Sequence, residues 1–228
     1  MRLVVGSVLI WAFVGHAAAG SMSVVADRDG TLFEDPEGAL ASGAGPSVFA
    51  GRNNFTDNGV RRGLFHFDLA GVLPPGGAHV VQSVAVVITN VSESNTTPRE
   101  YRLHRVLADW GEGASVSAGG GGAPAEPSDA TWIHTSSAHD FWTSNGGQFD
   151  GEPSARLVVA GPGAYRFEGP ELIRDLALWA ANPEHNFGWI LIGDETVRQT
   201  AKGFASREHP DPALRPVLEI RFRGAAER

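Results

Sequence analysis

The chain has 228 residues, a formal net charge of -8 at pH 7, no cysteine, 29 glycines and 14 prolines. This acidity excludes nucleic acid as a partner, because binding to phosphates needs a basic surface. Without cysteine, an exported domain of this size is held together by its core or by a bound ion, and not by disulfides. The many glycines and prolines indicate a fold with many turns.

The first nineteen residues have the composition of a secretory signal peptide. Arg2 gives the segment a positive start, an apolar run follows over residues 3–14, and small residues end with Ala19. We expect cleavage after Ala19 and a secreted or periplasmic mature protein. The apolar run is shorter than the about 20 residues of a membrane-spanning helix, so no membrane insertion is expected.

Alternation of apolar and polar residues with period two dominates the rest of the sequence. In residues 61–69, Phe65, Phe67 and Leu69 share one face of a strand, and Leu64 belongs to the other. Strands are expected at residues 47–51, 61–69, 83–91, 99–109, 130–135, 155–161, 164–168, 187–195, 202–208 and 216–222. About ten short strands separated by turns predict one all-β domain over residues 23–223, an antiparallel β-sandwich.

One segment, residues 169–184, breaks this alternation. Apolar residues from Leu172 to Trp179 recur there at helical spacing, and Pro170 stands in the first turn. The segment predicts one short helix that packs against an edge or an end of the sheets.

Acidic residues cluster in residues 26–38, at the start of the mature chain. Asp27, Asp29 and Glu34, with a glycine among them, supply the carboxylate oxygens that calcium prefers. The spacing is not that of an EF-hand loop, and solvated acids in a turn are the alternative. We expect these residues to be candidate ligands of one structural calcium ion.

The triplet Ser206-Arg207-Glu208 precedes the last expected strand. In a strand, Glu208 shares a face with Phe204, where an isolated buried charge would be costly. A metal ion or a bidentate arginine would relieve this cost, and Arg207 is a candidate for direct contact with a ligand. The candidate arginine partners of Glu208 are Arg61, Arg62 and Arg215.

Tryptophans in glycine-rich turns are candidate sugar-binding rings. Trp142 has Asn145, Gln148 and Asp150 close to it in the sequence, and Trp110 lies in a second such turn. Sugar rings stack on flat aromatic faces while amides and carboxylates bind their hydroxyls. Packing under a turn is the alternative for each tryptophan.

No sequence motif indicates catalysis by a nucleophile or by zinc. The chain has no cysteine, no GxSxG sequence and no HExxH sequence. Acidic residues such as Asp109 and Glu112 would hydrolyse glycosides only at a set separation across a cleft, which a sequence does not give. An enzymatic function therefore remains an alternative, and a non-catalytic function is favoured.

Six stretches, in order, resemble exported bacterial proteins with a DNRLRE-type domain, which are related to carbohydrate-binding module family 96. The stretches are residues 27–45, 61–77, 103–115, 129–134, 186–195 and 201–220. The Ser206-Arg207-Glu208 triplet matches the end of the family signature, although Gly203-Phe204-Ala205 replaces its more usual charged lead-in. The resemblance implies a jelly-roll-like β-sandwich, a polysaccharide ligand such as alginate, and a structural calcium ion.

These observations predict an exported, non-catalytic carbohydrate-binding protein. A structural protein of an extracellular matrix or cell surface is the alternative, and a polysaccharide-degrading enzyme is less favoured. The expected partners are a polysaccharide or glycan and a separate enzyme or surface-assembly chain. The negative net charge favours neutral glycans over polyanions, unless Arg61, Arg62, Arg207 or bound calcium makes a local positive surface.

Overall fold

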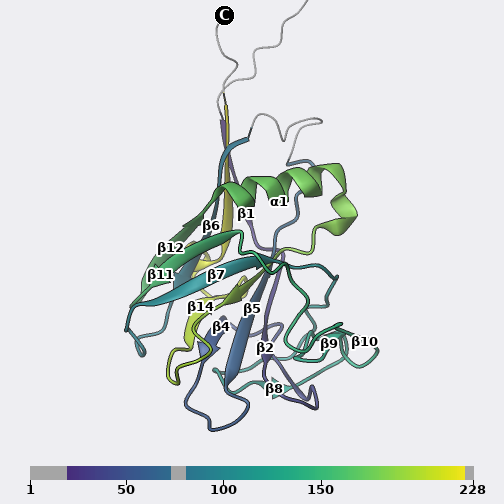
Figure 1. The fold of residues 1–228 in the computed structure, drawn as a ribbon, viewed down its shortest axis with the longest axis vertical. Coiled ribbons are helices and arrows are strands. Elements are labelled where there is room, and N and C mark those ends of the chain that lie inside the picture. The colour runs from purple at the N-terminus through teal and green to yellow at the C-terminus, as the bar shows by residue number, and fades with distance from the viewer. Residues whose placement is uncertain (1–19, 73–80, 224–228) are drawn as a thin grey trace, which may run out of the picture.

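The structure is a computed structural model that describes residues 20–72 and 81–223 (Figure 1). The expected signal peptide, residues 1–19, lies outside the described residues. The described helix is α1 (Pro170–Ala181), and two short 3-10 turns span Pro183–His185 and Pro212–Leu214. The strands are β1 (Gly20–Val25), β2 (Arg28–Phe33), β3 (Leu40–Ala41), β4 (Ser47–Arg52), β5 (Val60–His66), β6 (Val81–Asn90), β7 (Arg99–Arg105), β8 (Ala123–Pro124), β9 (His134–Ser136), β10 (Asp140–Phe141), β11 (Ala155–Val159), β12 (Gly163–Glu168), β13 (Trp189–Ile192), β14 (Lys202–Ala205) and β15 (Val217–Phe222).

Eleven strands form one antiparallel sheet that folds into two layers. The strand order is β1-β15-β6-β14-β4-β5-β13-β7-β11, with β12 paired to β6 and β2 paired to β5. β4 pairs with β14 through residues 47–50 and with β5 through residues 51–52, so it passes from one layer to the other. This architecture confirms the expected all-β, jelly-roll-like antiparallel sandwich.

Gly51 stands where β4 changes layers. Its φ is 109°, and a Cβ at this position would lie 2.8 Å from the Thr200 carbonyl oxygen. Glycine fits both the backbone conformation and the close approach, because it has no side chain.

The main core lies between the two layers. The inward faces of β6, β14 and β15 pack there against those of β5, β7 and β13. Phe65 and Phe67 point into this core, whereas Leu64 belongs to a second cluster on the other face of β5. The faces predicted from the alternation in residues 61–69 are therefore confirmed.

The second core covers the outer face of β2, β5 and β13. Leu64 and Ile190 from these strands pack there with Trp110 and Trp142 from the long segment 107–150. The layer is thus covered by apolar side chains on both faces, which explains why its central strands are buried almost throughout.

Helix α1 lies across one end of the sandwich (Figure 1). Leu172, Leu176 and Trp179 are buried in the main core, and the helix begins at Pro170, where the missing N–H removes no helical hydrogen bond. The helix and its packing role are as predicted. No helix in the described part of the chain is long and apolar enough to cross a membrane.

Strand positions near the expected sites differ from the prediction. β2 lies in the acidic cluster at residues 26–38, where no strand was expected, and its Asp29 and Gly30 pair with Phe65 and Leu64 of β5. The segment expected as a strand at 130–135 enters the short β9 only at its last residues.

The expected strand 202–208 ends at Ala205, and the triplet that follows it forms a turn. This turn carries Arg207 and Glu208 out of the sheet and toward β2.

Candidate functional site

Four charged side chains meet at the edge of β2, and we call Asp29, Glu112, Arg207 and Glu208 the carboxylate–arginine cluster. Arg207 donates from Nε and Nη2 to both carboxylate oxygens of Glu112, at 2.6 and 2.7 Å. The Arg207 backbone N–H donates to Asp29 Oδ2 at 2.6 Å, and Arg207 Nε lies 2.8 Å from Glu208 Oε1. The cluster therefore joins β2, the loop that carries Glu112, and the turn after β14.

β2 is an edge strand, and side chains and loops cover its outer backbone groups. The Asp29 N–H donates to Glu112 Oε1 at 2.9 Å, and the Thr31 N–H donates to the Ser42 carbonyl at 3.1 Å. An uncovered edge would offer unpaired donors to another chain. Glu112 therefore closes the edge of β2 as well as binding Arg207.

Two glycines position Glu112. A Cβ at Gly111 would lie 2.0 Å from the Ser128 carbonyl oxygen, and a Cβ at Gly113 would lie 1.8 Å from Asp129 Oδ1. Gly113 also has φ 71°, a conformation that other residues rarely adopt. The Gly-Glu-Gly sequence therefore lets the loop press against residues 128–129 and point Glu112 at the cluster.

The cluster carries more buried negative charge than its arginine neutralises. Asp29 is fully buried, and burial raises its pKa well above the ordinary value, with Glu208 and Glu112 adding to the shift. Burial also raises the pKa of Glu208. Asp29 Oδ1 and Glu208 Oε2 are buried and have no hydrogen-bond partner among the described residues.

The other two expected metal ligands have different partners. Asp27 Oδ1 lies 2.6 Å from His66 Nδ1, and Glu34 Oε2 accepts a hydrogen bond from the Val60 backbone N–H at 2.9 Å. Of the expected ligands, the structure brings together Asp29 and Glu208 and leaves Asp27 and Glu34 outside the cluster.

The arginine partner of Glu208 is its neighbour Arg207 and none of the three expected from the sequence. Arg62 forms a bidentate pair with Glu195, at 2.7 and 3.0 Å. Arg61 donates to the Gly120 carbonyl, and Arg215 donates to the His209 carbonyl.

The two candidate tryptophans are packed rather than presented to solvent. Trp142 is 5% exposed, and its Nε1 donates to the Thr131 carbonyl at 2.9 Å. Trp110 is 2% exposed, and its Nε1 donates to the Phe187 carbonyl. Both rings belong to the second core, so their burial argues against sugar stacking and for the alternative, packing under a turn.

The polar residues near Trp142 do not converge on its ring. Asn145 is exposed, Gln148 is half-buried, and Asp150 accepts a hydrogen bond from Arg105 Nη2 at 2.8 Å. The Asp150 carbonyl also lies 2.8 Å from His104 Nδ1. Asp150 therefore serves the contact between β7 and the segment before β11.

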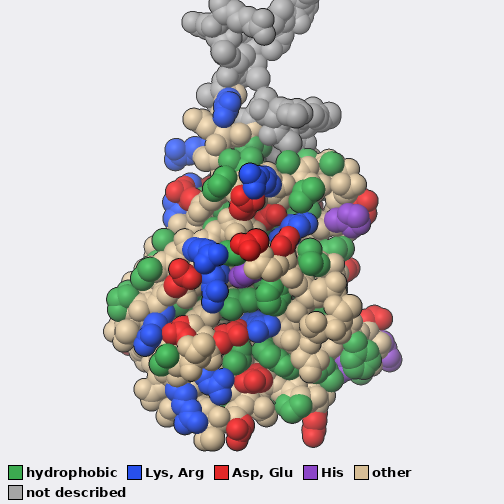
Figure 2. All heavy atoms as spheres, viewed as in Figure 1, with side chains coloured by type: hydrophobic (Ala, Val, Ile, Leu, Met, Phe, Trp, Pro, Cys, Tyr) green, Lys and Arg blue, Asp and Glu red, His purple; other side chains and the backbone are tan. Residues whose placement is uncertain are grey.

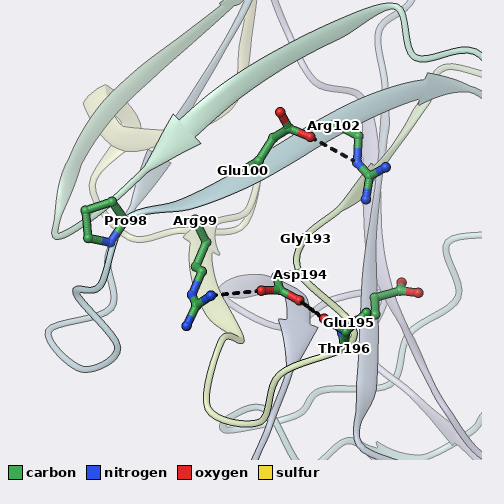
Figure 3. A pocket seen from close by; sticks show the side chains of 8 residues that line it. All are labelled: Pro98, Arg99, Glu100, Arg102, Gly193, Asp194, Glu195 and Thr196. Atoms are coloured by element: carbon green, nitrogen blue, oxygen red, sulfur yellow. Dashed lines mark hydrogen bonds and ion pairs between the residues drawn. The ribbon is translucent and has the colours of Figure 1, made fainter.

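A pocket of about 480 Å³ lies between β7 and the loop after β13. It is lined by Pro98, Arg99, Glu100, Arg102, Gly193, Asp194, Glu195 and Thr196. Figure 3 shows Arg102 reaching from β7 toward the loop that carries Asp194 and Glu195. On the face of the molecule seen in Figure 2, basic and acidic side chains are interspersed over this region.

Most charges of the pocket are paired with one another. Arg99 lies 3.2 Å from Asp194, and Arg62 holds Glu195. Arg102 has the weakest pairing, since its Nε lies 3.7 Å from Glu100. This nitrogen is buried and, like Arg99 Nε, has no hydrogen-bond partner among the described residues. The pocket thus offers a guanidinium and several carboxylates that are open to further hydrogen bonds.

Sequence reasoning did not find this pocket or the pairing of Glu112 with Arg207. The pocket residues come from β7 and a turn about 90 positions later, and no local pattern marks such a long-range meeting. For Glu112, the available signal in the sequence was the glycine on each side. Such glycines indicate a loop whose backbone lies very close to another segment.

Comparisons with protein-family profiles and with curated proteins find no match for this chain. The resemblance to DNRLRE-type proteins therefore stays a prediction.

The buried His104 predicts a pH dependence of stability. Burial and the nearby Arg102 and Arg156 lower its pKa, although the bond to the Asp150 carbonyl opposes the shift. The unfolded chain then binds a proton more readily than the folded chain below pH about 6.5. His104 should therefore lower the free energy of unfolding as the pH drops from 7 to 5, whereas the raised pKa values of Asp29, Glu208 and Asp175 act in the opposite direction.

Replacing His104 by Asn should remove its contribution, which makes the slope of the free energy of unfolding against pH less positive by up to about 1.4 kcal/mol per pH unit, measured by urea unfolding. Asn keeps a donor for the Asp150 carbonyl and does not titrate. Some slope should remain, because burial also lowers the pKa of His134. The same replacement at the exposed His185 is the control, and an equal effect there would contradict the assignment.

Proposed function

We propose that the protein is an exported, non-catalytic carbohydrate-binding protein whose ligand lies in the pocket between β7 and the loop after β13. The observation that supports this most is the lining of that pocket, which combines arginine donors with carboxylate acceptors. Each sugar hydroxyl donates one hydrogen bond and accepts others, so a mixed lining suits it. The groups stand on β7 and on a loop held by ion pairs, which keeps them oriented.

Arg102 is the residue that we assign to the ligand. Its side chain is 39% exposed, and among the described residues its one charged contact is the 3.7 Å approach of Nε to Glu100. Because Nε is buried, the available donors are the two terminal nitrogens of the guanidinium, which can bind two neighbouring hydroxyls at once. No aromatic ring is among the described residues that line the pocket, so binding would rest on hydrogen bonds more than on stacking.

The charge pairing in the pocket favours a neutral glycan. Asp194 and Glu195 each have an arginine partner, which leaves no strong local excess of positive charge for a polyanion. Binding of alginate, the polyanion that the resemblance implies, would depend on the positive charges of Arg102 and of the neighbouring Arg156.

The electrostatics of Asp194 favour a role as a hydrogen-bond acceptor over a role as a general acid. Burial raises the pKa of Asp194, but hydrogen bonds from Thr196 and Val197 outweigh it and lower the pKa below its ordinary value. A glycosidase needs one carboxylic acid whose raised pKa keeps it protonated. Asp194 is better suited to accept hydrogen bonds than to donate a proton.

Replacing Arg102 by Met tests the proposal. Affinity for a bound polysaccharide should fall about tenfold or more, because a hydrogen bond to a charged group is worth about 1.5–3 kcal/mol. The melting temperature should hold, since Arg102 makes no short contact that supports the fold. Affinity is measured by calorimetry against a panel of neutral plant and algal polysaccharides and alginate.

The matched control is Arg221→Met, at an exposed arginine of β15 in the other layer. Binding that is lost in both variants, or in neither, would contradict a site at Arg102. A folded protein that binds no member of the panel would favour the structural role at a cell surface. Release of new sugar ends from the polysaccharide would favour an enzyme.

A further inference from the structure

The carboxylate–arginine cluster contains a buried charge that the described residues do not satisfy. Asp29 is fully buried, and its Oδ1 has no hydrogen-bond partner among the described residues. Glu208 Oε2 is also buried and has no partner among them. Leaving a buried carboxylate oxygen without a partner is costly, because the oxygen has lost its water.

Two other buried aspartates show that unpartnered carboxylate oxygens are not a general feature of the fold. Asp129 accepts hydrogen bonds from the Ser115 and Glu126 backbone N–H groups, one on each carboxylate oxygen. Asp175 Oδ2 accepts from Ser154 and Trp189. Asp29 is different because its buried Oδ1 has no hydrogen-bond partner among the described residues and one of its oxygens lies within 4.8 Å of oxygens of Glu112 and Glu208.

The three carboxylates of the cluster lie close enough to share one ion. One oxygen from each of Asp29, Glu112 and Glu208 lies within 4.8 Å of the other two. With all groups ionised, three carboxylates and one guanidinium sum to a charge of -2. A divalent cation would neutralise this charge, and each of the two carboxylates that has an unpartnered oxygen would serve as a ligand to it.

We infer that the cluster binds one divalent cation of the calcium type, with Asp29, Glu112 and Glu208 as ligands. The donor atoms are all carboxylate oxygens, and calcium accepts irregular sets of oxygens at about 2.3–2.6 Å. Opposite ligands of calcium can thus be about 5 Å apart, whereas magnesium requires a tighter octahedron. Zinc is disfavoured because no histidine or cysteine belongs to the cluster.

Such an ion would act on the fold and not on the carbohydrate pocket. Its ligands come from β2, from the loop at residues 111–113 and from the turn after β14, which are far apart in the sequence. Binding would hold together three segments that already meet through Arg207. This inference does not depend on the proposed carbohydrate ligand, because it concerns different residues.

A proton shared between Asp29 and Glu208 is the competing explanation. A shared proton would also remove one negative charge, and it would satisfy both oxygens, because the protonated oxygen would donate a hydrogen bond to the other. The two explanations differ in what they predict for added calcium. Only the ion site binds calcium with a stoichiometry of about one per chain.

The test measures calcium binding to full-length mature protein that has been stripped with EDTA and dialysed. Calorimetry should show one saturable site, and a hundredfold excess of calcium over its Kd should raise the melting temperature by about 5–10 °C. Magnesium at the same concentration should raise it less. Asp29→Asn and Glu208→Gln should each weaken calcium binding more than about tenfold, because affinity follows the charge of the ligands.

The matched controls are Asp57→Asn and Glu37→Gln, at exposed acidic residues. They should bind calcium as the wild type does. Wild-type protein that binds no calcium would overturn the proposal, and so would calcium binding that both cluster variants retain. A failure to fold would be visible in the circular dichroism of either variant, and the wild-type titration alone would then decide.

Discussion

Replacing Gly113 by Ala is expected to lower the free energy of unfolding by about 3–5 kcal/mol, measured by urea unfolding. The backbone strain of a non-glycine residue at φ 71° costs about 1–3 kcal/mol, and forcing a Cβ to within 1.8 Å of Asp129 Oδ1 adds a similar amount. Asp129 would have to move, and its bonds to the Ser115 and Glu126 N–H groups would weaken.

Gly71 is the matched control for this change. Its φ of 72° is almost the same, but nothing lies within 4 Å of the position that a Cβ would take. Gly71→Ala should therefore show the backbone cost alone, about 1 kcal/mol or slightly more. Equal losses in the two variants would contradict the claim that close approach to Asp129 matters.

The fold class follows from the sequence because its strands repeat a simple pattern. In residues 61–69, alternate residues separate into the main core and the second core, and Phe65 and Leu64 show the two faces. The helix follows from the spacing of Leu172 and Trp179, which a strand would place on opposite faces.

β2 could not be predicted in the same way. Its sequence begins with Arg-Asp-Gly, in which aspartate and glycine favour turns, and pairing with β5 and cover by Glu112 make it a strand. Tertiary contacts override local preference here, because they satisfy the backbone groups that the sequence would leave to water.

The candidate sites show the same limit. The sequence marked Arg207 and Glu208 as unusual, but the partner Glu112 stands 95 positions before Arg207. Trp142 was marked by its turn, yet the turn lies on the outer face of a sheet that needs apolar cover. A tryptophan beside glycines in the sequence indicates that the ring lies in a loop. Whether the ring is exposed or buried depends on the three-dimensional packing, which the sequence does not give.

The pairing of Arg207 with Glu112 should be measurable as a coupling energy. In calcium-free buffer, Arg207→Met is expected to cost about 3 kcal/mol, the lower end of the range for breaking a buried ion pair. The lower end applies because the Arg207 side chain is 36% exposed, whereas that of Glu112 is 13% exposed. Glu112→Met should cost a similar amount, because Arg207 keeps its contact with Glu208 but the Asp29 backbone N–H loses its acceptor.

The double variant should cost about 1–3 kcal/mol less than the sum of the two single changes. Removing both partners leaves no unpaired arginine or Glu112 carboxylate, and methionine can fill the space with apolar contact. Urea unfolding of the four proteins in EDTA gives the cycle, and Arg221→Met controls for the loss of an arginine elsewhere. Strict additivity would show that Arg207 and Glu112 act independently, in spite of their two short hydrogen bonds.

Repeating the Arg207→Met measurement in calcium relates this ion pair to the proposed ion. Without the guanidinium, the three carboxylates sum to -3 instead of -2, so a divalent cation should bind the variant more tightly. Calcium should therefore restore more stability to Arg207→Met than it adds to the wild type, because binding to the folded state alone adds stability. An equal gain in both proteins would mean that Arg207 and the cation do not share the same carboxylates.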